Sequence, residues 1–432
     1  MGKNFVLKGN ICYSKSAKEL ALVADGYLVC EEGLCTGVFQ QLPQQYQHLP
    51  LEDYTGKMIL PGLVDIHVHA PQYAFRCLGM DMELIEWLSH YAFPEEAKYK
   101  DLAYAEKAYG SFVEDLRQGP NTRAAVFATC HVPASLLLMD MLEASGLVTL
   151  VGKVNMDRNS HPDLQESGPE ASARDTEAWV SRVLTEKAYH NTAPILTPRF
   201  IPSCSDGLMV KLKEIQQKYG LSVQSHLSEN KGEIAWVREL CPDAANYSAA
   251  YDYFGLFGGS GTPTIMAHCV WMEEEELALM AERQIFVAHC PQSNMNLASG
   301  IAPIRRFLDR GIPVGLGSDV AGGCHTSIFR AMSDAIQVSK LYWRLQDQNE
   351  APLAIEEAFY LGTMGGGAFF GKVGSFLPAY EFDALIIDDS ELRAPYDLSL
   401  NERLARIIYH PDRCTVERKF VRGRDILHKA AL

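Results

Sequence analysis

Short apolar runs that end in polar or ionisable residues recur through the middle of the chain. Runs of this length, bounded by turn or helix signals, are typical of buried strands. We predict eight of them, at residues 63–67, 125–129, 148–154, 193–198, 221–226, 263–268, 285–290 and 312–319. Helical patterns separate most neighbouring strands. The predicted helices are 206–220, which has apolar residues three and four apart and ends at a glycine, 272–284 and 302–311.

Strands that alternate with helices over roughly 260 residues predict an α/β fold, a (β/α)8 TIM barrel. A doubly wound open sheet shows the same alternation and is the alternative. We favour the barrel because ionisable residues stand at the carboxyl ends of several non-adjacent strands. Barrel enzymes place their catalytic groups at those ends.

The two ends of the chain have a different pattern. Residues 1–60 and 372–432 contain short strand-like segments that are broken by glycine and turn residues. We predict that both ends pair into one small β-sandwich domain beside the barrel. The chain then divides into the N-terminal part of the sandwich (1–60), the barrel (61–371) and the C-terminal part of the sandwich (372–432).

Composition narrows the possible partners and the compartment. The 432 residues suffice for one large domain with an accessory unit. A formal charge of −15 argues against nucleic acid as a ligand, whereas a small neutral substrate fits. No apolar run is long enough to span a bilayer, so we expect no membrane association. Eleven scattered cysteines without a Cys-x-x-Cys pair favour a reduced, cytoplasmic protein.

A candidate metal site begins with His67 and His69. Two residues apart on a strand, they project from the same face and can bind the same ion. His226, His268 and Asp319 end the fifth, sixth and eighth predicted strands, where an ionisable group is costly unless it is paired or metal-bound. Any one of them alone is better interpreted as a hydrogen-bonded core residue. Together they favour a metal, and nitrogens with a carboxylate suit zinc or, less selectively, iron(II).

Six motifs carry a family resemblance. They occur in the order "PGLVDIHVHAPQ", "TPRFIPSCS", "QSHLSEN", "MAHC", "AHCPQSNMNLASG" and "GLGSDVAGG". The chain resembles the amidohydrolase superfamily, for which His-x-His with downstream His, His and Asp is typical. Within it, "HAPQ", "TPRF" and "HLSEN" together resemble the guanine deaminases. The resemblance covers the first to the eighth predicted strand and extends to the flanking β segments.

The resemblance implies one metal ion per chain, zinc or alternatively iron(II), and a homodimer. The implied metal ligands are His67, His69, His226 and Asp319. The implied catalytic residues are Glu229 as proton shuttle, Asp319, and His268, which lies close to the reacting water without being a firm ligand. The implied substrate-binding residues are His69, Gln72, Arg199, Phe200, His226, Glu229, His268 and Asp319.

The implied reaction is hydrolysis of guanine to xanthine and ammonia, a step of purine breakdown. Zinc lowers the pKa of water bound to it toward ~7. The C2 atom of guanine is weakly electrophilic until N3 is protonated, and Glu229 can take a proton from the water and deliver it to N3. Asp319 can accept the second proton as ammonia leaves, and His268 can orient the attacking oxygen.

The residues implied to bind the purine base can also be explained by structural roles. The amide of Gln72 offers a donor and an acceptor to a purine edge, but it can also cap the following loop. Arg199 offers only donors, suited to the O6 carbonyl, but it can also pair with a carboxylate at the rim. Phe200 can present its ring or its backbone. Leu84 and Trp87 are better explained by core packing than by the pocket.

Three further residues are assigned supporting roles. Lys153 ends the third predicted strand, and we expect it to be buried or ion-paired rather than to bridge two metals. His289 and Asn294 are expected to order the loop around the site without touching substrate.

Two other functions stay open at this point. One is deamination of another heterocycle of the adenosine, cytosine or triazine type, and Gln72 with the pair Arg199 and Phe200 is the feature that discriminates it from guanine deamination. The other is a non-catalytic scaffold on the same fold, which metal content would discriminate. A dehydrogenase is disfavoured because no Gly-x-Gly-x-x-Gly follows a predicted strand.

Overall fold

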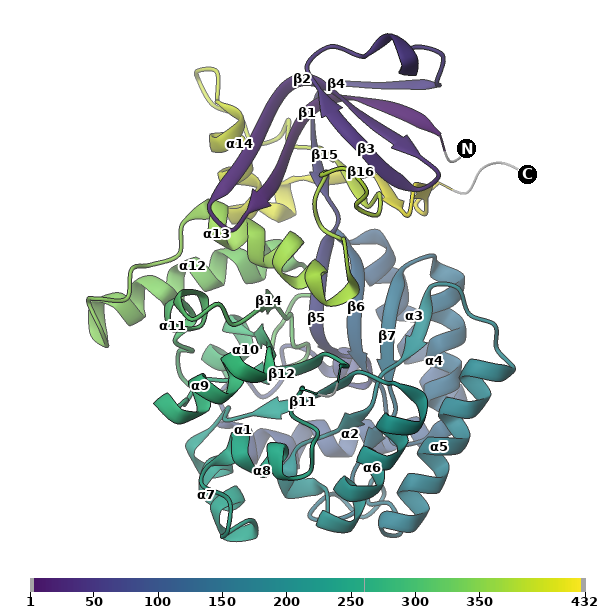
Figure 1. The fold of residues 1–432 in the computed structure, drawn as a ribbon, viewed down its shortest axis with the longest axis vertical. Helices are drawn as coiled ribbons and strands as arrows, with labels where there is room; N and C mark the ends of the chain where they lie inside the picture. The colour runs from purple at the N-terminus through teal and green to yellow at the C-terminus, as the bar shows by residue number, and fades with distance from the viewer. Residues whose placement is uncertain (1–3, 260, 429–432) are drawn as a thin grey trace.

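Two parallel sheets form the centre of the larger part of the molecule (Figure 1). This computed structural model describes residues 4–259 and 261–428. Within them, the first sheet has the order β5-β6-β7-β9, with bounds Leu63–His69, Asn121–Phe127, Val148–Gly152 and Thr192–Pro194. The second has the order β11-β12-β13-β14, with bounds Val223–Leu227, Thr264–His268, Phe286–His289 and Val314–Leu316. The strand predictions are confirmed, with shifted ends.

The predicted strand 193–198 is divided in two. It forms β9 and, after a break, β10 (Thr197–Pro198), which pairs with β8 (Val154–Asn155). Both pieces end in a proline, which has no N–H to donate to a ladder. The break therefore follows from the local sequence.

Backbone contacts link the two sheets at both of their facing edges. On one side, the Asp319 N–H donates to the His67 carbonyl at 2.9 Å, and the His69 N–H donates to the Val320 carbonyl at 3.1 Å. On the other side, Leu196 forms a parallel bridge with Val223. The described ladders are two four-stranded sheets rather than one closed ring. An α/β fold with parallel sheets is thus confirmed.

Helices surround the sheets (Figure 1). Their bounds are α1 Leu84–Trp87, α2 Phe93–Ala97, α3 Leu102–Gln118, α4 Val132–Ser145, α5 Pro169–Thr185, α6 Asp206–Tyr219, α7 Lys231–Leu240, α8 Tyr247–Tyr253, α9 Glu274–Arg283, α10 Pro291–Asn296, α11 Ile304–Asp309, α12 Ile328–Leu345, α13 Ile355–Tyr360 and α14 Leu400–Tyr409. The three predicted helices are α6, α9 and α11. Ser205 caps α6 by accepting from the Leu208 N–H, and Gly220 ends it with φ of +65°.

The chain ends form a separate mixed sheet above the parallel ones (Figure 1). In the described residues its order is β17-β16-β15-β4-β1-β2-β3. The bounds are β1 Phe5–Ser16, β2 Glu19–Glu31, β3 Leu34–Phe39, β4 Leu51–Pro61, β15 Ala384–Asp388, β16 Thr415–Val421 and β17 Arg424–Asp425. The two ends meet where β15 pairs antiparallel with β4, and the rings of Phe5 and Phe382 lie 5.3 Å apart.

This sheet differs from the expected sandwich, since its strands are hydrogen-bonded in one continuous order rather than in two facing sheets. The pairing of β1 and β2 contains a register shift between Gly9 and Ile11. Such irregularities bend a strand, so one sheet can enclose its own apolar core. Phe5, Ile59 and Phe420 belong to that core.

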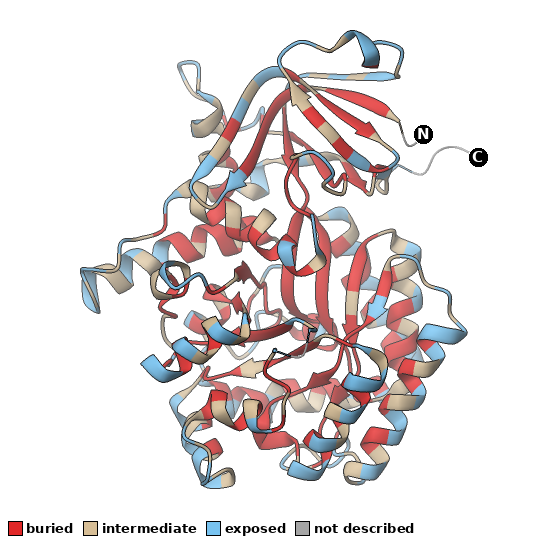
Figure 2. Cartoon of the chain, viewed as in Figure 1, coloured by how far each residue is buried: buried red, intermediate tan, exposed pale blue. Residues whose placement is uncertain are grey.

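The burial of residues follows the layers of the fold, with the sheets inside and the helices outside. Figure 2 shows buried residues along the central strands and exposed ones on the outer sides of the helices. Among the described residues, none of the helices combines the length and apolar character that a membrane crossing requires.

Candidate active site

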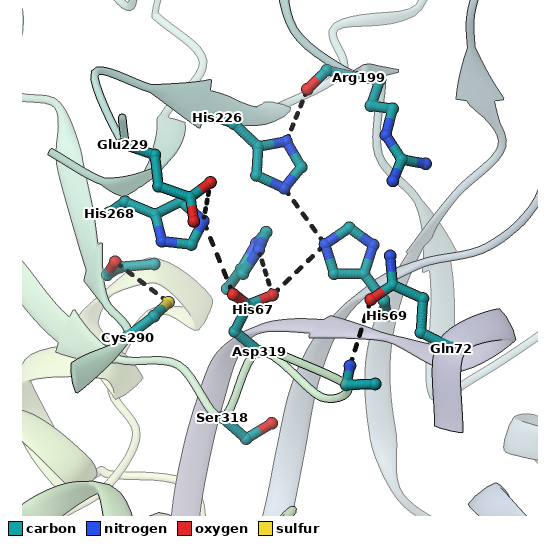
Figure 3. Close-up of polar contacts among 12 residues, drawn as sticks. His67, His69, Gln72, Arg199, His226, Glu229, His268, Cys290, Ser318 and Asp319 are labelled. Atoms are coloured by element: carbon teal, nitrogen blue, oxygen red, sulfur yellow. Dashed lines mark hydrogen bonds and ion pairs between the residues drawn. The ribbon is translucent and has the colours of Figure 1, made fainter. Parts of the chain in front are cut away.

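Ionisable side chains from four strand ends converge on one point (Figure 3). His67 and His69 lie on β5, His226 on β11 and His268 at the end of β12, and Asp319 follows β14. His67 is completely buried and Asp319 is 5% exposed. His268 and Asp319 adopt φ of +72° and +45°, a conformation that is uncommon outside glycine and is often found at functional sites. The predicted cluster is therefore brought together by the fold.

The distances within the cluster suit a shared cation. The Nε2 atoms of His69 and His226 are 3.2 Å apart, and Asp319 Oδ1 lies 3.1 Å from His67 Nε2 and 3.4 Å from His69 Nε2. Two nitrogens that each bind a tetrahedral zinc at about 2.1 Å are about 3.4 Å apart. The ligand atoms of His67, His69 and Asp319 lie within 4.8 Å of one another, as do those of His67, His226 and His268, so neighbouring parts of the cluster have a spacing that suits a metal.

The hydrogen bonds of the histidines leave their Nε2 atoms available to bind a metal. His226 Nδ1 lies 2.6 Å from the Arg199 carbonyl, which can only accept, so Nδ1 carries the proton and Nε2 keeps its lone pair. Both ring nitrogens of His67 are buried; Nε2 faces Asp319 Oδ1 at 3.1 Å, and Nδ1 has no hydrogen-bond partner among the described residues. Buried polar atoms normally have a partner. The donor set of His67, His69, His226 and Asp319 therefore fits a metal.

The protonation states of the four proposed ligands are also those that metal binding requires. Burial lowers the pKa values of His67, His69 and His226, so the imidazoles are neutral and can act as ligands. Burial opposes ionisation of Asp319, but the neighbouring His67 and His268 hold its pKa below the ordinary value. Asp319 is thus a carboxylate.

Glu229 stands beside the cluster without belonging to the ligand set. Its Oε2 lies 3.3 Å from His268 Nε2, and Ser299 Oγ donates to its Oε1 at 3.1 Å. Burial raises the pKa of Glu229 to about 7. A carboxyl group with a pKa near neutrality can both accept and return a proton. Its position and pKa therefore suit proton transfer.

The two ring nitrogens of His268 face different partners. Its Nδ1 lies 2.9 Å from Asn294 Oδ1, while its Nε2 faces Glu229 and, at 3.7 Å, Asp319 Oδ2. Burial opposes protonation, yet these two carboxylates raise the pKa of His268. Asn294 thus contacts a residue of the site, and its ordering role stays a prediction. His289, for which the same role is expected, is fully buried, its pKa is lowered to about 3 by burial, and neither ring nitrogen has a hydrogen-bond partner among the described residues.

A pocket opens over the cluster. Figure 3 shows Gln72 and Arg199 to one side of the histidines and Glu229 to the other. Gln72 lies in the short 3-10 helix η2 (Ala70–Phe75), and Arg199 and Phe200 directly follow β10. The lining residues are His69, Gln72, Leu84, Trp87, Leu88, Arg199, Phe200, His226, Glu229, Glu233, His268, Leu297, Asp319 and Gly322.

Leu84 and Trp87 have two roles. They belong to the hydrophobic core, which was the preferred explanation, and they also line the pocket. They are also buried, and an apolar residue that is buried under a pocket has the same sequence pattern as one in the core. Lys153, by contrast, is buried and forms an ion pair with Glu166, as expected.

Sequence reasoning missed two buried carboxylates. Asp65 accepts from the Ser318 N–H at 3.0 Å and from its hydroxyl, which ties β5 to the segment that carries Asp319. The position of Asp65 inside an apolar strand could have identified it from the sequence. Glu96 accepts from Gln72 Nε2 and Arg199 Nη1 at 2.8 and 2.6 Å, and no local pattern distinguishes it.

The chain matches the amidohydrolase family model over residues 58–425. It is 36% identical to guanine deaminase of Dictyostelium discoideum, covering 98% of both chains, and 37% identical to human guanine deaminase, covering 86% of this chain and 83% of that protein. A crystal structure of guanine deaminase from C. acetobutylicum with guanine in the active site has a TM-score of 0.94 and 44% identity, covering 98% of this chain and 100% of that one. The chain belongs to the amidohydrolase family.

Proposed function

We propose that this chain catalyses the hydrolytic deamination of guanine to xanthine and ammonia. One observation carries the proposal: a buried His and Asp cluster has a carboxyl group of raised pKa, Glu229, on one side and hydrogen-bonding residues, Gln72 and Arg199, on the other. The similarity to guanine deaminases over nearly the whole chain supports it.

The proposed cofactor is one zinc ion per chain, with iron(II) as the alternative. The ligands would be His67, His69, His226 and Asp319, whose nitrogens and carboxylate suit zinc. Zinc supplies Lewis acidity and lowers the pKa of water bound to it to about 7.

The protein groups would move the protons. Glu229, as a carboxylate, takes a proton from the attacking water and delivers it to N3 of guanine, which makes C2 electrophilic. Asp319 accepts the second proton and releases it to the departing ammonia. His268, held by Asn294, orients the attacking oxygen with its Nε2 side.

Base recognition is assigned to the opposite side of the pocket. Arg199 and the amide of Gln72 would donate to the O6 edge of guanine, and Phe200, 6% exposed, would form a wall. A site built to hydrogen-bond its substrate rejects analogues that lack the group by ~10⁴ or more. His69 and His226, also assigned to substrate binding, line the same pocket as Glu229 and His268.

The direct test is incubation of the purified chain with guanine, following the loss of its ultraviolet absorbance and the release of ammonia. Adenine, cytosine and guanosine serve as controls. Turnover of one of these in preference to guanine would favour the alternative of a deaminase for another heterocycle. Absence of near-stoichiometric metal would favour a non-catalytic scaffold.

We also propose that the two parallel sheets belong to one closed (β/α)8 barrel. The contacts of Asp319 with His67 and of Leu196 with Val223 at the facing edges support closure. The proposed domains are the barrel at 61–371 and an accessory β domain from 1–60 and 372–432. An experimental structure with complete ladders at both edges would test both.

Assembly and location are proposals as well. The family resemblance supports a homodimer, which sedimentation of the purified chain would test. Eleven scattered cysteines without a Cys-x-x-Cys pair support a reducing compartment, the cytoplasm.

A further inference from the structure

Glu96 is a carboxylate that the proposed chemistry does not use. It lies on α2 and is 1% exposed. Its two oxygens bind the two residues assigned to base recognition: Oε1 accepts from Gln72 Nε2 at 2.8 Å, and Oε2 accepts from Arg199 Nη1 at 2.6 Å. One buried side chain therefore joins segments that are distant in the sequence.

The contact fixes which way the Gln72 amide points. Its Oε1 accepts from the Ala321 N–H at 3.2 Å, while its Nε2 donates to Glu96. A carboxylate can only accept and a backbone N–H can only donate. A flipped amide would bring two acceptors together at Glu96 and two donors together at Ala321. The remaining N–H of Gln72 consequently has one orientation to offer a ligand.

The same helix holds Arg199. The guanidinium lies 5.0 Å from the ring centroid of Phe93, and Phe93 and Glu96 are three residues apart on α2 and share one face. A guanidinium has five N–H donors, so the bond to Glu96 leaves others for the pocket that Arg199 lines.

The charges of Arg199 and Glu96 determine which kind of ligand group they favour. The side chains of Arg199 and Glu96 are 4% and 1% exposed, and a guanidinium buried this far is costly without a partner. With Glu96 the pair has no net charge, yet Arg199 and Gln72 still present N–H donors. Such a surface suits a neutral carbonyl oxygen rather than an anion or an amino group.

We propose that Glu96 is a positioning residue that sets the preference for a purine with a carbonyl at C6. The inference rests on the proposed guanine deamination. Glu96 acts through Gln72 and Arg199 and does not touch the substrate.

The test compares guanine with 2-aminopurine, which has the same amine at C2 but no oxygen at C6. For Glu96→Gln we expect kcat/KM for guanine to fall about 100-fold, mostly through KM, because the amide flips and Arg199 loses its anchor. For 2-aminopurine, measured as a substrate or as a competitive inhibitor, we expect a change of less than about threefold. Metal content should stay at the wild-type level.

Two variants complete the design. Glu95→Gln is the matched control, because the neighbouring Glu95 pairs with Lys98 and Tyr104 instead, and we expect both substrates to behave as in the wild type. Glu96→Asp keeps the charge on a shorter side chain, and we expect the preference for guanine to fall less than in Glu96→Gln.

The outcomes separate the two proposals. If the wild type deaminates no guanine, the proposed function fails. If the wild type is active and Glu96→Gln weakens both purines equally, or neither, the role of Glu96 in selectivity is refuted. Should Glu96→Gln fail to fold, Glu96→Asp decides, since an unchanged ratio between the two purines there refutes the role as well.

Discussion

The Nε2 atoms of His69 and His226 lie 3.2 Å apart, although the residues are 157 positions apart in the sequence. His226 Nδ1 is committed to the Arg199 carbonyl, so its Nε2 presents a lone pair to His69. Asp319 Oδ1 approaches the same place, 3.4 Å from His69 Nε2. Lone pairs this close repel each other unless a proton or a cation lies between them. Metal binding should therefore depend strongly on these two histidines.

Substitution of His226 by alanine should abolish metal binding. We expect metal content to fall from about one ion per chain to below about 0.1, and guanine turnover to fall by at least about 10³-fold, because one of the four proposed ligands is lost and the metal supplies the reactive water. Elemental analysis and ammonia release measure the two effects. The control is His48→Ala, an exposed histidine outside the site. Full metal content in His226→Ala would refute the ligand assignment.

Metal removal should also destabilise the fold. A ligand that binds only the folded state adds RT ln(1 + [L]/Kd) to stability, about 4 kcal/mol at a thousandfold excess over Kd. We expect treatment with a chelator to lower the unfolding midpoint of the wild type and to leave that of His226→Ala unchanged. Equal shifts in the two proteins would show that the chelator acts elsewhere.

Glu229→Gln should slow the reaction without disturbing the site. The substitution keeps size and polarity but removes the group that takes and returns protons, so we expect kcat to fall by about 10²–10⁴-fold. Metal content should change little, because Glu229 is outside the ligand set. A variant with wild-type kcat would remove Glu229 from the mechanism.

The pH dependence of the wild type should report the same group. Burial raises the pKa of Glu229 to about 7 from an ordinary value of 4.5, and only the carboxylate can accept a proton from water. Activity is therefore expected to be lost as pH falls through that pKa. A cation nearby favours the carboxylate, so in the metal-loaded protein we expect this acid limb between about 4.5 and about 7. Glu229→Gln should lack the limb in kcat.

The sequence predicts the parts of this protein that depend on local pattern. Apolar runs located the parallel strands, and strand alternation placed His67 and His69 on one face. What it could not predict depends on packing between distant segments. Trp87 is apolar and buried whether it lines a pocket or a core, and Glu96 has no feature of its own until α2 meets Gln72 and Arg199.

Arg199→Ala should impair guanine recognition specifically. Loss of the guanidinium removes donors for O6 and leaves Glu96 buried with one partner fewer, so we expect kcat/KM for guanine to fall by about 10²–10⁴-fold. Steady-state kinetics with metal analysis measures this. The matched control is Arg283→Ala, which breaks a surface ion pair with Asp252. Unchanged guanine turnover in Arg199→Ala would contradict the assignment of Arg199 to guanine recognition.

Lys419 on β16 should anchor the accessory sheet to the larger part of the molecule. It is completely buried, and its Nζ donates to the carbonyls of Leu116, Arg117 and Gly119 at the end of α3, at distances of 3.0, 3.1 and 2.9 Å. A helix end presents carbonyls without intrahelical partners, and an ammonium group satisfies them. For Lys419→Met we expect about 3 kcal/mol of destabilisation, because buried acceptors lose their donor.

Urea unfolding measures this effect, with Lys8→Met as the control. Lys8 pairs with Asp53 at the surface, where the partner is 53% exposed, and such pairs contribute about 0–1 kcal/mol. We expect metal content and the KM for guanine to stay at wild-type values in folded Lys419→Met, since the site is formed by other elements. If Lys419→Met were no less stable than Lys8→Met, the three carbonyls would have to find other donors, and the anchoring role would be wrong.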